Sequence, residues 1–219
     1  MSSRESPRRG ALLPVAMIVV ILAIAAVAGL LIAGGKGGGG NAGAAAGAGR
    51  LAGSEASPPK PAPPLALRNY RGEPVNVSTY HGDAVLVTFL YTHCPDVCPL
   101  IATNLGFALR LMPPKVAARV RIVAVSVDPR GDTPKAIAAF LARHGVAGKM
   151  EYLIGSAHEL GRVWEAWNVG SERDAGKPEF VNHTGIVYGV GASGKITTLY
   201  ASNFQPSEIA HDVPLLEAR

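Results

Sequence analysis

The sequence predicts an α/β domain behind one N-terminal membrane-spanning segment and a linker. Two short runs of apolar and β-branched residues, Val85–Tyr91 and Val120–Val127, are typical of strands buried on both faces. Between them, residues 101–112 repeat apolar side chains at helical spacing, and the pattern stops at Pro113. Strand, helix and strand over this length predict a right-handed crossover between two parallel strands.

The charges are divided unevenly along the chain. Residues 1–64 hold six of the 21 lysines and arginines and two of the 16 acidic residues, so residues 65–219 carry 15 basic and 14 acidic residues, a net charge of +1. A nearly neutral C-terminal part excludes a basic face for nucleic acid. Collagen, coiled coil and full disorder are also excluded, because the glycines show no three-residue period, apolar heptads are absent, and Val, Leu and Ile are ample.

The apolar segment 11–33 contains no charge over 23 positions. A helix of this length spans roughly 35 Å, enough to cross the hydrocarbon core of a bilayer. Three arginines precede it in residues 1–10 and only Lys36 follows closely, so the positive-inside rule places residues 1–10 in the cytoplasm. We therefore expect a single-pass protein of the cell membrane with an extracytoplasmic C-terminal domain. A cleaved secretory signal is the alternative, which the length of the segment disfavours.

Residues 34–64 are expected to form a linker. They contain ten glycines and five prolines in 31 positions, which predicts a flexible Gly/Ala stretch followed by a stiffer proline-rich one. A random coil of this length reaches ~30 Å. The linker would hold the domain near the bilayer and let it turn toward a membrane-bound partner.

The domain is expected to cover residues 65–219. It starts with two short runs, Leu65–Leu67 and Val75–Val77, which could pair as a hairpin. Two helices beyond the crossover are predicted by their caps. Thr133 and Pro134 supply the N-cap and first residue of one helix, and a capping box of Ser156 and Glu159 opens the other.

The C-terminal part predicts a second hairpin and a last helix. Ile186–Val190 and Ile196–Tyr200 flank a glycine-rich turn. The last helix, over residues 207–216, is expected to be interrupted by Pro214. The whole order of elements is that of a thioredoxin-like sandwich of three layers, preceded by the N-terminal hairpin.

The chain has only two cysteines, Cys94 and Cys98, which lie between the first buried strand and the helix after it. Because Pro99 is well placed as the first helical residue, we expect Cys98 near the N-cap. Unpaired N–H groups and the helix dipole stabilise a thiolate there, so Cys98 should be more acidic than a free thiol. Two thiols at this spacing can form a disulfide or bind one soft metal ion.

Two simpler interpretations of the cysteines are disfavoured. A disulfide that only stabilises the fold is common in exported proteins, but a bridge over four residues closes a very small loop and stabilises least. A structural zinc site needs four ligands, and two cysteines do not supply them.

Three sequence blocks resemble the Sco/SenC family of copper proteins, which assist cytochrome c oxidase assembly. They are YTHCPDVCP after the first buried strand, VSVDPRGDTP about thirty residues later, and FVNHTG ahead of the last hairpin. The resemblance covers residues 65–213. It implies a thioredoxin-like fold that binds copper through two thiolates and one histidine, with Cys94, Cys98 and His183 as the matching positions and the cysteines as a redox pair.

The residues themselves support copper less specifically. Thiolates are soft ligands that select Cu(I), and an imidazole added to two sulfurs suits copper in both oxidation states. His183 is 89 positions from Cys94, so the sequence alone does not bring them together. Among the other histidines, His93 is the best alternative ligand, although a side chain adjacent to Cys94 is expected to point away and tune the thiol electrostatically.

This chain departs from the family pattern at Asn182, where many members carry aspartate before the histidine. The change removes one negative charge and one possible acceptor beside the metal. Asp128 and Asp132 match the pattern, and we expect them to serve in a turn and in helix capping.

The resemblance implies a membrane-anchored copper chaperone that delivers Cu(I) or Cu(II) to the copper centre of cytochrome c oxidase, with the oxidase subunit carrying that centre as partner. Copper binding needs both thiolates, so it should weaken as pH falls, and oxidation to a disulfide would eject the metal. The alternative is a thiol–disulfide oxidoreductase that reduces the cysteines of the target's copper site and does not depend on His183. A peroxiredoxin-type peroxidase ranks lower because its usual cysteine motif differs.

Overall fold

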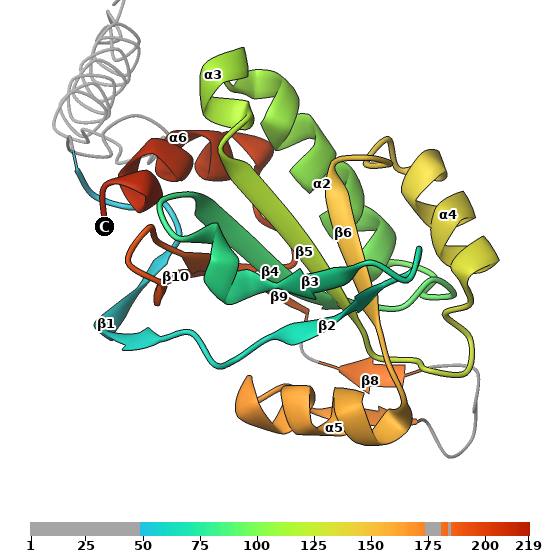
Figure 1. Ribbon diagram of the computed structural model, residues 1–219. Coiled ribbons are helices and arrows are strands. Elements are labelled where there is room, and N and C mark those ends of the chain that lie inside the picture. Colours follow the sequence, from blue (N-terminus) through green and yellow to red (C-terminus); the bar gives the residue numbers. More distant parts are fainter. Residues whose placement is uncertain (1–48, 174–180, 184) are drawn as a thin grey trace, which may run out of the picture. The chain divides into compact units, whose positions relative to one another are not determined.

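The computed structural model describes residues 49–173, 181–183 and 185–219, with the backbone alone described for residues 171–173 and 181–183. Figure 1 shows the elements in chain order: β1 Ser54–Pro61, β2 Ala66–Asn69, β3 Pro74–Asn76, the 3-10 helix η1 Val77–Tyr80, β4 Ala84–Leu90, α2 Val97–Leu111, α3 Pro114–Ala117, β5 Val120–Ser126, α4 Pro134–Arg143, β6 Met150–Ile154, α5 Ala157–Ala166, β7 Ser171–Arg173, β8 Val181–His183, β9 Ile186–Val190, β10 Lys195–Ala201 and α6 Pro206–Glu217.

A mixed sheet of eight strands forms the centre of the domain, in the order β1-β10-β9-β4-β5-β6-β2-β3. Its middle strands β4, β5 and β6 are parallel and are joined through α2 and α4. All seven residues of β4 are buried, as expected for a strand covered on both faces. The predicted crossover is therefore confirmed.

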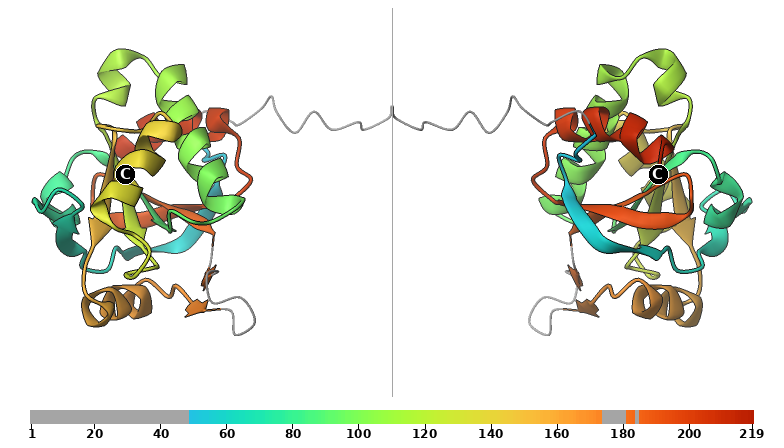
Figure 2. Two further views of the ribbon diagram at one scale, coloured as in Figure 1. Left: turned by 90° about the vertical axis from the view of Figure 1, so that its right-hand side faces the viewer. Right: turned by 90° about the vertical axis from the view of Figure 1, so that its left-hand side faces the viewer.

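Helices cover both faces of this sheet. In Figures 1 and 2, α2, α4 and α6 lie over one face and α5 lies over the other. The α5 side is closed by an aromatic cluster in which the Trp167 ring lies 6.0 Å from that of Phe89 and 5.3 Å from that of Tyr188, measured between centroids. This arrangement confirms the expected thioredoxin-like architecture.

The local signals in the sequence are also confirmed. The β2–β3 hairpin pairs Leu67 with Val75, and β9 pairs with β10 in antiparallel fashion. Thr133 caps α4 by accepting the Ala136 N–H at 3.2 Å, and the predicted capping box opens α5.

The linker prediction was wrong for residues 54–61, which form β1 and pair with β10. Upstream of β1, Leu51 is buried in the core, and the buried carboxylate of Asp212 accepts the N–H groups of Ala52 at 2.8 Å and Gly53 at 2.9 Å. The prolines of this segment argue against a strand in sequence analysis, because proline lacks the backbone N–H that pairs with a neighbouring strand. An edge strand tolerates them, and two of the three fall in the irregular stretch of the β1–β10 register.

The last helix differs from expectation as well, because α6 continues through Pro214. Proline removes one backbone hydrogen bond from a helix. Buried side chains on both sides of it, Ile209, Val213 and Leu216, hold α6 against the core. Tertiary packing therefore outweighs the local disruption.

The segment 11–33, which we expect to cross the membrane, lies outside the described residues, together with residues 1–10 and 34–48. Within the described part of the chain, no helix has both the length and the apolar character required for a membrane span.

Candidate metal centre

The two cysteines lie where the chain leaves the carboxyl end of β4. Because β4 and β5 are parallel, the loop after β5 lies at the same edge of the sheet. From that loop Asp132 accepts the backbone N–H of Thr92 at 2.7 Å. The same carboxylate accepts the hydroxyls of Ser126 at 2.6 Å and Tyr152 at 3.0 Å. Asp132 therefore ties the start of the cysteine loop to β5 and β6.

This role of Asp132 goes beyond the turn and capping functions expected from sequence. Burial raises the pKa of its carboxyl group, which the three hydrogen bonds oppose by favouring the charged form. Asp128 does serve in a turn, since its Oδ1 accepts the Arg130 N–H at 3.2 Å. No local signal reveals the longer-range role, because the partners of Asp132 come from three separate segments.

Cys98 lies in the first turn of α2. The N-cap is Asp96, whose Oδ1 accepts the Val97 N–H at 2.6 Å, so Cys98 is the second residue of the helix rather than its N-cap. Its backbone N–H donates to the sulfur of Cys94 at 3.4 Å. The positive end of α2 therefore stabilises charge on Cys94.

The prediction that Cys98 is the acidic thiol was wrong, and the acidic thiol is Cys94. A hydrogen bond from the Cys98 side chain, with help from backbone donors, overcomes the effect of burial and lowers the pKa of Cys94 from 9.0 to about 6. The same hydrogen bond and burial raise the pKa of Cys98. Cys94 is 8% exposed, Cys98 is fully buried, and no disulfide joins them. At neutral pH the site therefore holds one slightly exposed thiolate and one enclosed thiol.

His93, the alternative ligand, is exposed. Its Nδ1 lies 3.2 Å from the hydroxyl oxygen of Thr92. The same nitrogen faces Gly131 in the loop after β5, where an added Cβ would lie 3.2 Å from it.

His183 belongs to β8, where its backbone pairs with Ser171 of β7; its side chain lies outside the described part of the structure. Two residues later, Gly185 packs so closely on α2 that an added Cβ would lie 2.9 Å from Cγ1 of Val97. Two residues span at most ~7 Å, so the backbone at His183 lies within about that distance of Gly185. The described side chains alone contain no group of three metal-binding residues. The set of Cys94, Cys98 and His183 therefore stays a prediction.

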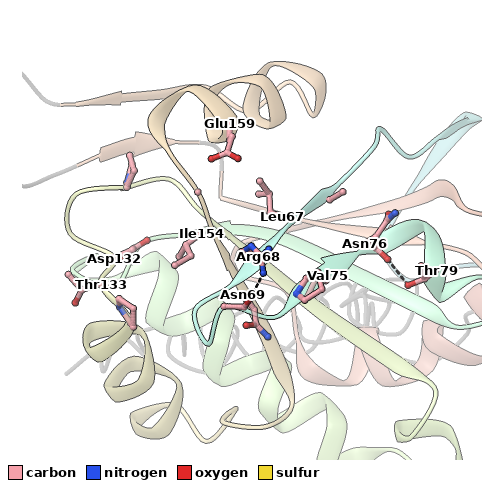
Figure 3. Close-up of a pocket in the computed structure, with 16 residues that line it drawn as sticks. Leu67, Arg68, Asn69, Val75, Asn76, Thr79, Asp132, Thr133, Ile154 and Glu159 are labelled. Atoms are coloured by element: carbon pink, nitrogen blue, oxygen red, sulfur yellow. Dashed lines mark hydrogen bonds between the residues drawn. The ribbon is translucent and has the colours of Figure 1, made fainter.

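A cavity of about 960 Å³ lies between the β2–β3 hairpin, the loop that holds Asp132, the end of β6 and the start of α5. Figure 3 shows Asp132 and Thr133 at one end of the lining and Val75, Asn76 and Thr79 toward the other. Neither cysteine lines it. The predicted metal centre is thus separate from the cavity, and Asp132 contributes to the surroundings of both.

Comparisons with known proteins agree on one family. The family model described as SCO1/SenC matches residues 54–216. The chain is similar to the mitochondrial SCO1 homolog of Mus musculus, with 28% identity over 154 residues that cover 68% of this chain and 54% of the relative. It spans about half the length of this relative and of its human counterpart.

Solved structures with the same fold include apo Sco1 from Thermus thermophilus, with a TM-score of 0.65 and 28% identity, covering 77% of this chain and 97% of that one. The ScoI structure of Bradyrhizobium japonicum, determined with copper bound, gives a TM-score of 0.58 and 28% identity over 69% of this chain and 96% of the other.

Proposed function

The chain belongs to the SCO1/SenC family, and from this premise we propose that it is a membrane-anchored copper chaperone with an extracytoplasmic domain. Sco proteins are cytochrome c oxidase assembly proteins. We propose that this one delivers copper to the copper centre of the oxidase, and that the subunit carrying that centre is its partner. Copper is the cargo, and Cys94, Cys98 and His183 are its proposed ligands.

The observation that carries the proposal is the pairing of an acidic, slightly exposed thiol with an enclosed one at the start of α2. A thiolate at Cys94 can meet an incoming copper ion without first losing a proton at neutral pH. Cys98 then gives up its proton and completes a pair of soft ligands. The close packing of Gly185 on Val97 supports an imidazole of His183 as the third ligand.

Delivery follows as ligand exchange. A receiving site with its own thiolates can take over copper one bond at a time, starting at Cys94, the less buried of the two cysteines. Cys98, once released, regains its proton because its pKa is raised. That reprotonation favours release of the cargo over its return.

The same geometry favours a second candidate, a thiol–disulfide oxidoreductase. The Cys94 thiolate would attack one sulfur of a target disulfide, form a mixed disulfide and release the other target sulfur as a thiolate that takes up a proton. Cys98 would then lose its proton and attack Cys94, which frees the second target thiol and leaves a Cys94–Cys98 disulfide. Two electrons pass to the target, so an external dithiol must restore the reduced pair.

Copper titration of the full chain in detergent separates the two candidates. We expect wild type to bind one copper ion with thiolate-to-copper charge-transfer absorption, and His183→Ala to lose most of the Cu(II) affinity and change the absorption. His93→Ala is the matched control, because His93 is exposed on the loop beside Cys94. It should bind like wild type.

Disulfide exchange with a small disulfide substrate, measured on the same variants, completes the test. A chaperone site predicts that His183→Ala exchanges disulfides at the wild-type rate although it has lost most of its Cu(II) affinity. Equal copper binding by wild type and His183→Ala would reject the three-ligand site and favour the oxidoreductase. For the proposed anchor, protease added to spheroplasts with an intact cytoplasmic membrane should digest residues 49–219, and full protection of the domain would reject the extracytoplasmic location.

A further inference from the structure

The large apolar side chains exposed in the described part of the chain all lie on α2. They are Leu100, Phe107 and Leu111, with exposed fractions of 43%, 47% and 60%. Their spacing of seven and four residues places them on one face of the helix. The exposure is greatest at the end of α2, where Pro113 and Pro114 turn the chain into α3. We call the segment Phe107–Lys115 the α2–α3 corner.

This corner lies at the end of the domain remote from the cysteines. α2 holds Cys98 in its first turn and runs 15 residues, ~22 Å, away from the two cysteines. β10 runs parallel to β4, since both are antiparallel to β9, so α6 also runs away from the cysteine end. An ion pair of 3.6 Å between Arg119 and Glu217 links the chain after α3 to the end of α6.

The N-terminal segment enters the domain at this same end. Gly49 is the first described residue, and its carbonyl oxygen accepts a hydrogen bond from the guanidinium of Arg219, just beyond α6. Because β1 belongs to the sheet, only the fifteen residues 34–48 separate Gly49 from the apolar segment 11–33. If these fifteen residues form the linker expected from sequence, they would reach ~20 Å, less than the whole of residues 34–64. If segment 11–33 is anchored in a bilayer, the corner therefore stays close to the lipid.

The charges at the corner suit a lipid surface. The Arg110 guanidinium carbon lies 4.2 Å from the centroid of the Phe107 ring, and Lys115 is exposed. Among the described residues, neither cation has a carboxylate within ion-pair distance. Long basic side chains beside exposed aromatic and aliphatic groups are typical of interfacial helices, which place the apolar groups among the acyl chains and the cations among phosphates.

We propose that the α2–α3 corner docks on the lipid surface, with Phe107 and Leu111 inserted at the headgroup boundary and Arg110 and Lys115 on lipid phosphates. The inference rests on the membrane anchor of the proposed function and is independent of copper. Docking by this end of the domain leaves the cysteine loop at the opposite end of α2, up to ~20 Å farther from the lipid.

The test uses the full chain in nanodiscs of phosphatidylcholine and phosphatidylglycerol that contain a diazirine phospholipid. After irradiation, mass spectrometry locates the lipid adducts along the chain. We expect adducts in the domain to concentrate at residues 107–115 and to be scarce at residues 92–100. In the double variant Phe107→Ser/Leu111→Ser, the yield of lipid adducts at residues 107–115 should fall at least five-fold. Leu100→Ser, an exposed leucine on the same helix, is the matched control and should keep it.

Each contrary result overturns the proposal. Adducts spread evenly over the domain mean that it does not dock, and adducts centred on residues 92–100 mean that it docks by the opposite end or lies on its side. Labelling unchanged in the double variant, or a chain that does not copurify with the nanodiscs, rejects the docking as well. Thermal unfolding and copper titration of the same samples verify the fold and score the copper function separately, so either proposal can fail while the other stands.

Discussion

Replacing Cys98 by alanine should make Cys94 a much weaker acid. The largest cause of its low pKa is the hydrogen bond from the Cys98 thiol, which the variant removes, while the backbone donors persist. We expect the pKa of Cys94 to rise from about 6 to between about 8 and its ordinary value of 9.0. The thiolate fraction at pH 7 then falls from about 90% to between about 10% and about 1%, a loss of roughly 10- to 90-fold.

The assay is alkylation by iodoacetamide from about pH 5 to pH 10, together with the ultraviolet absorbance of the thiolate. Wild type should show a midpoint near pH 6 for one thiol, and Cys98→Ala should show it at least two pH units higher. The reciprocal variant, Cys94→Ala, removes the same hydrogen bond from Cys98 but keeps its burial, which raises the pKa, so that this thiol should still not react below about pH 9. A Cys98→Ala midpoint that stays near 6, or ready alkylation of Cys98 at neutral pH, would refute the reasoning.

Three further predictions concern the cargo site and its supports. At pH 8, Cys94 is already deprotonated and Cys98 is protonated, so binding of Cu(I) should release about one proton, which can be measured in weakly buffered solution. The apparent copper affinity should therefore rise tenfold per pH unit near pH 8 and more steeply below pH 6. A copper affinity that does not depend on pH would contradict this. Asp132→Ala leaves three donors without their acceptor and should lower the free energy of unfolding by about 3 kcal/mol in urea denaturation; a loss under about 1 kcal/mol would show that water replaces the carboxylate. Asp212→Ala should destabilise by a similar ~3 kcal/mol and speed hydrogen exchange at the Gly53 amide, and unchanged exchange would argue against the carboxylate as its acceptor.

The features that the sequence predicted are those with local signals. β4 and β5 are continuous apolar runs, and the starts of α4 and α5 carry side chains that bond within the same turn. β6 has no such signal in five residues that include Glu151, so it was not predicted. Its position depends on pairing with β5, which only the folded chain supplies.

The acidity of the thiols shows how a small local shift changes the chemistry. Sequence analysis took Pro99 as the first helical residue, but Asp96 caps the helix and moves its start to Val97. The helix N–H groups therefore face Cys94 instead of Cys98. Both cysteines were identified from sequence, while the assignment of the charge needed the backbone geometry. Gly185, two residues after His183, packs on Val97 of α2, and no spacing in the sequence encodes that contact.

The hydrogen bonds from Ala52 and Gly53 to the Asp212 carboxylate affect how the domain responds to a pulling force. A force transmitted along the chain toward β1 first meets Arg219 at Gly49 and then the Asp212 carboxylate at Ala52 and Gly53. Because Asp212 belongs to α6, the force passes into the helical layer before it can peel the edge strand from β10. A pulling force on the N-terminal segment would thus load α6 before it separates β1 from β10 in the sheet that supports the cysteine loop.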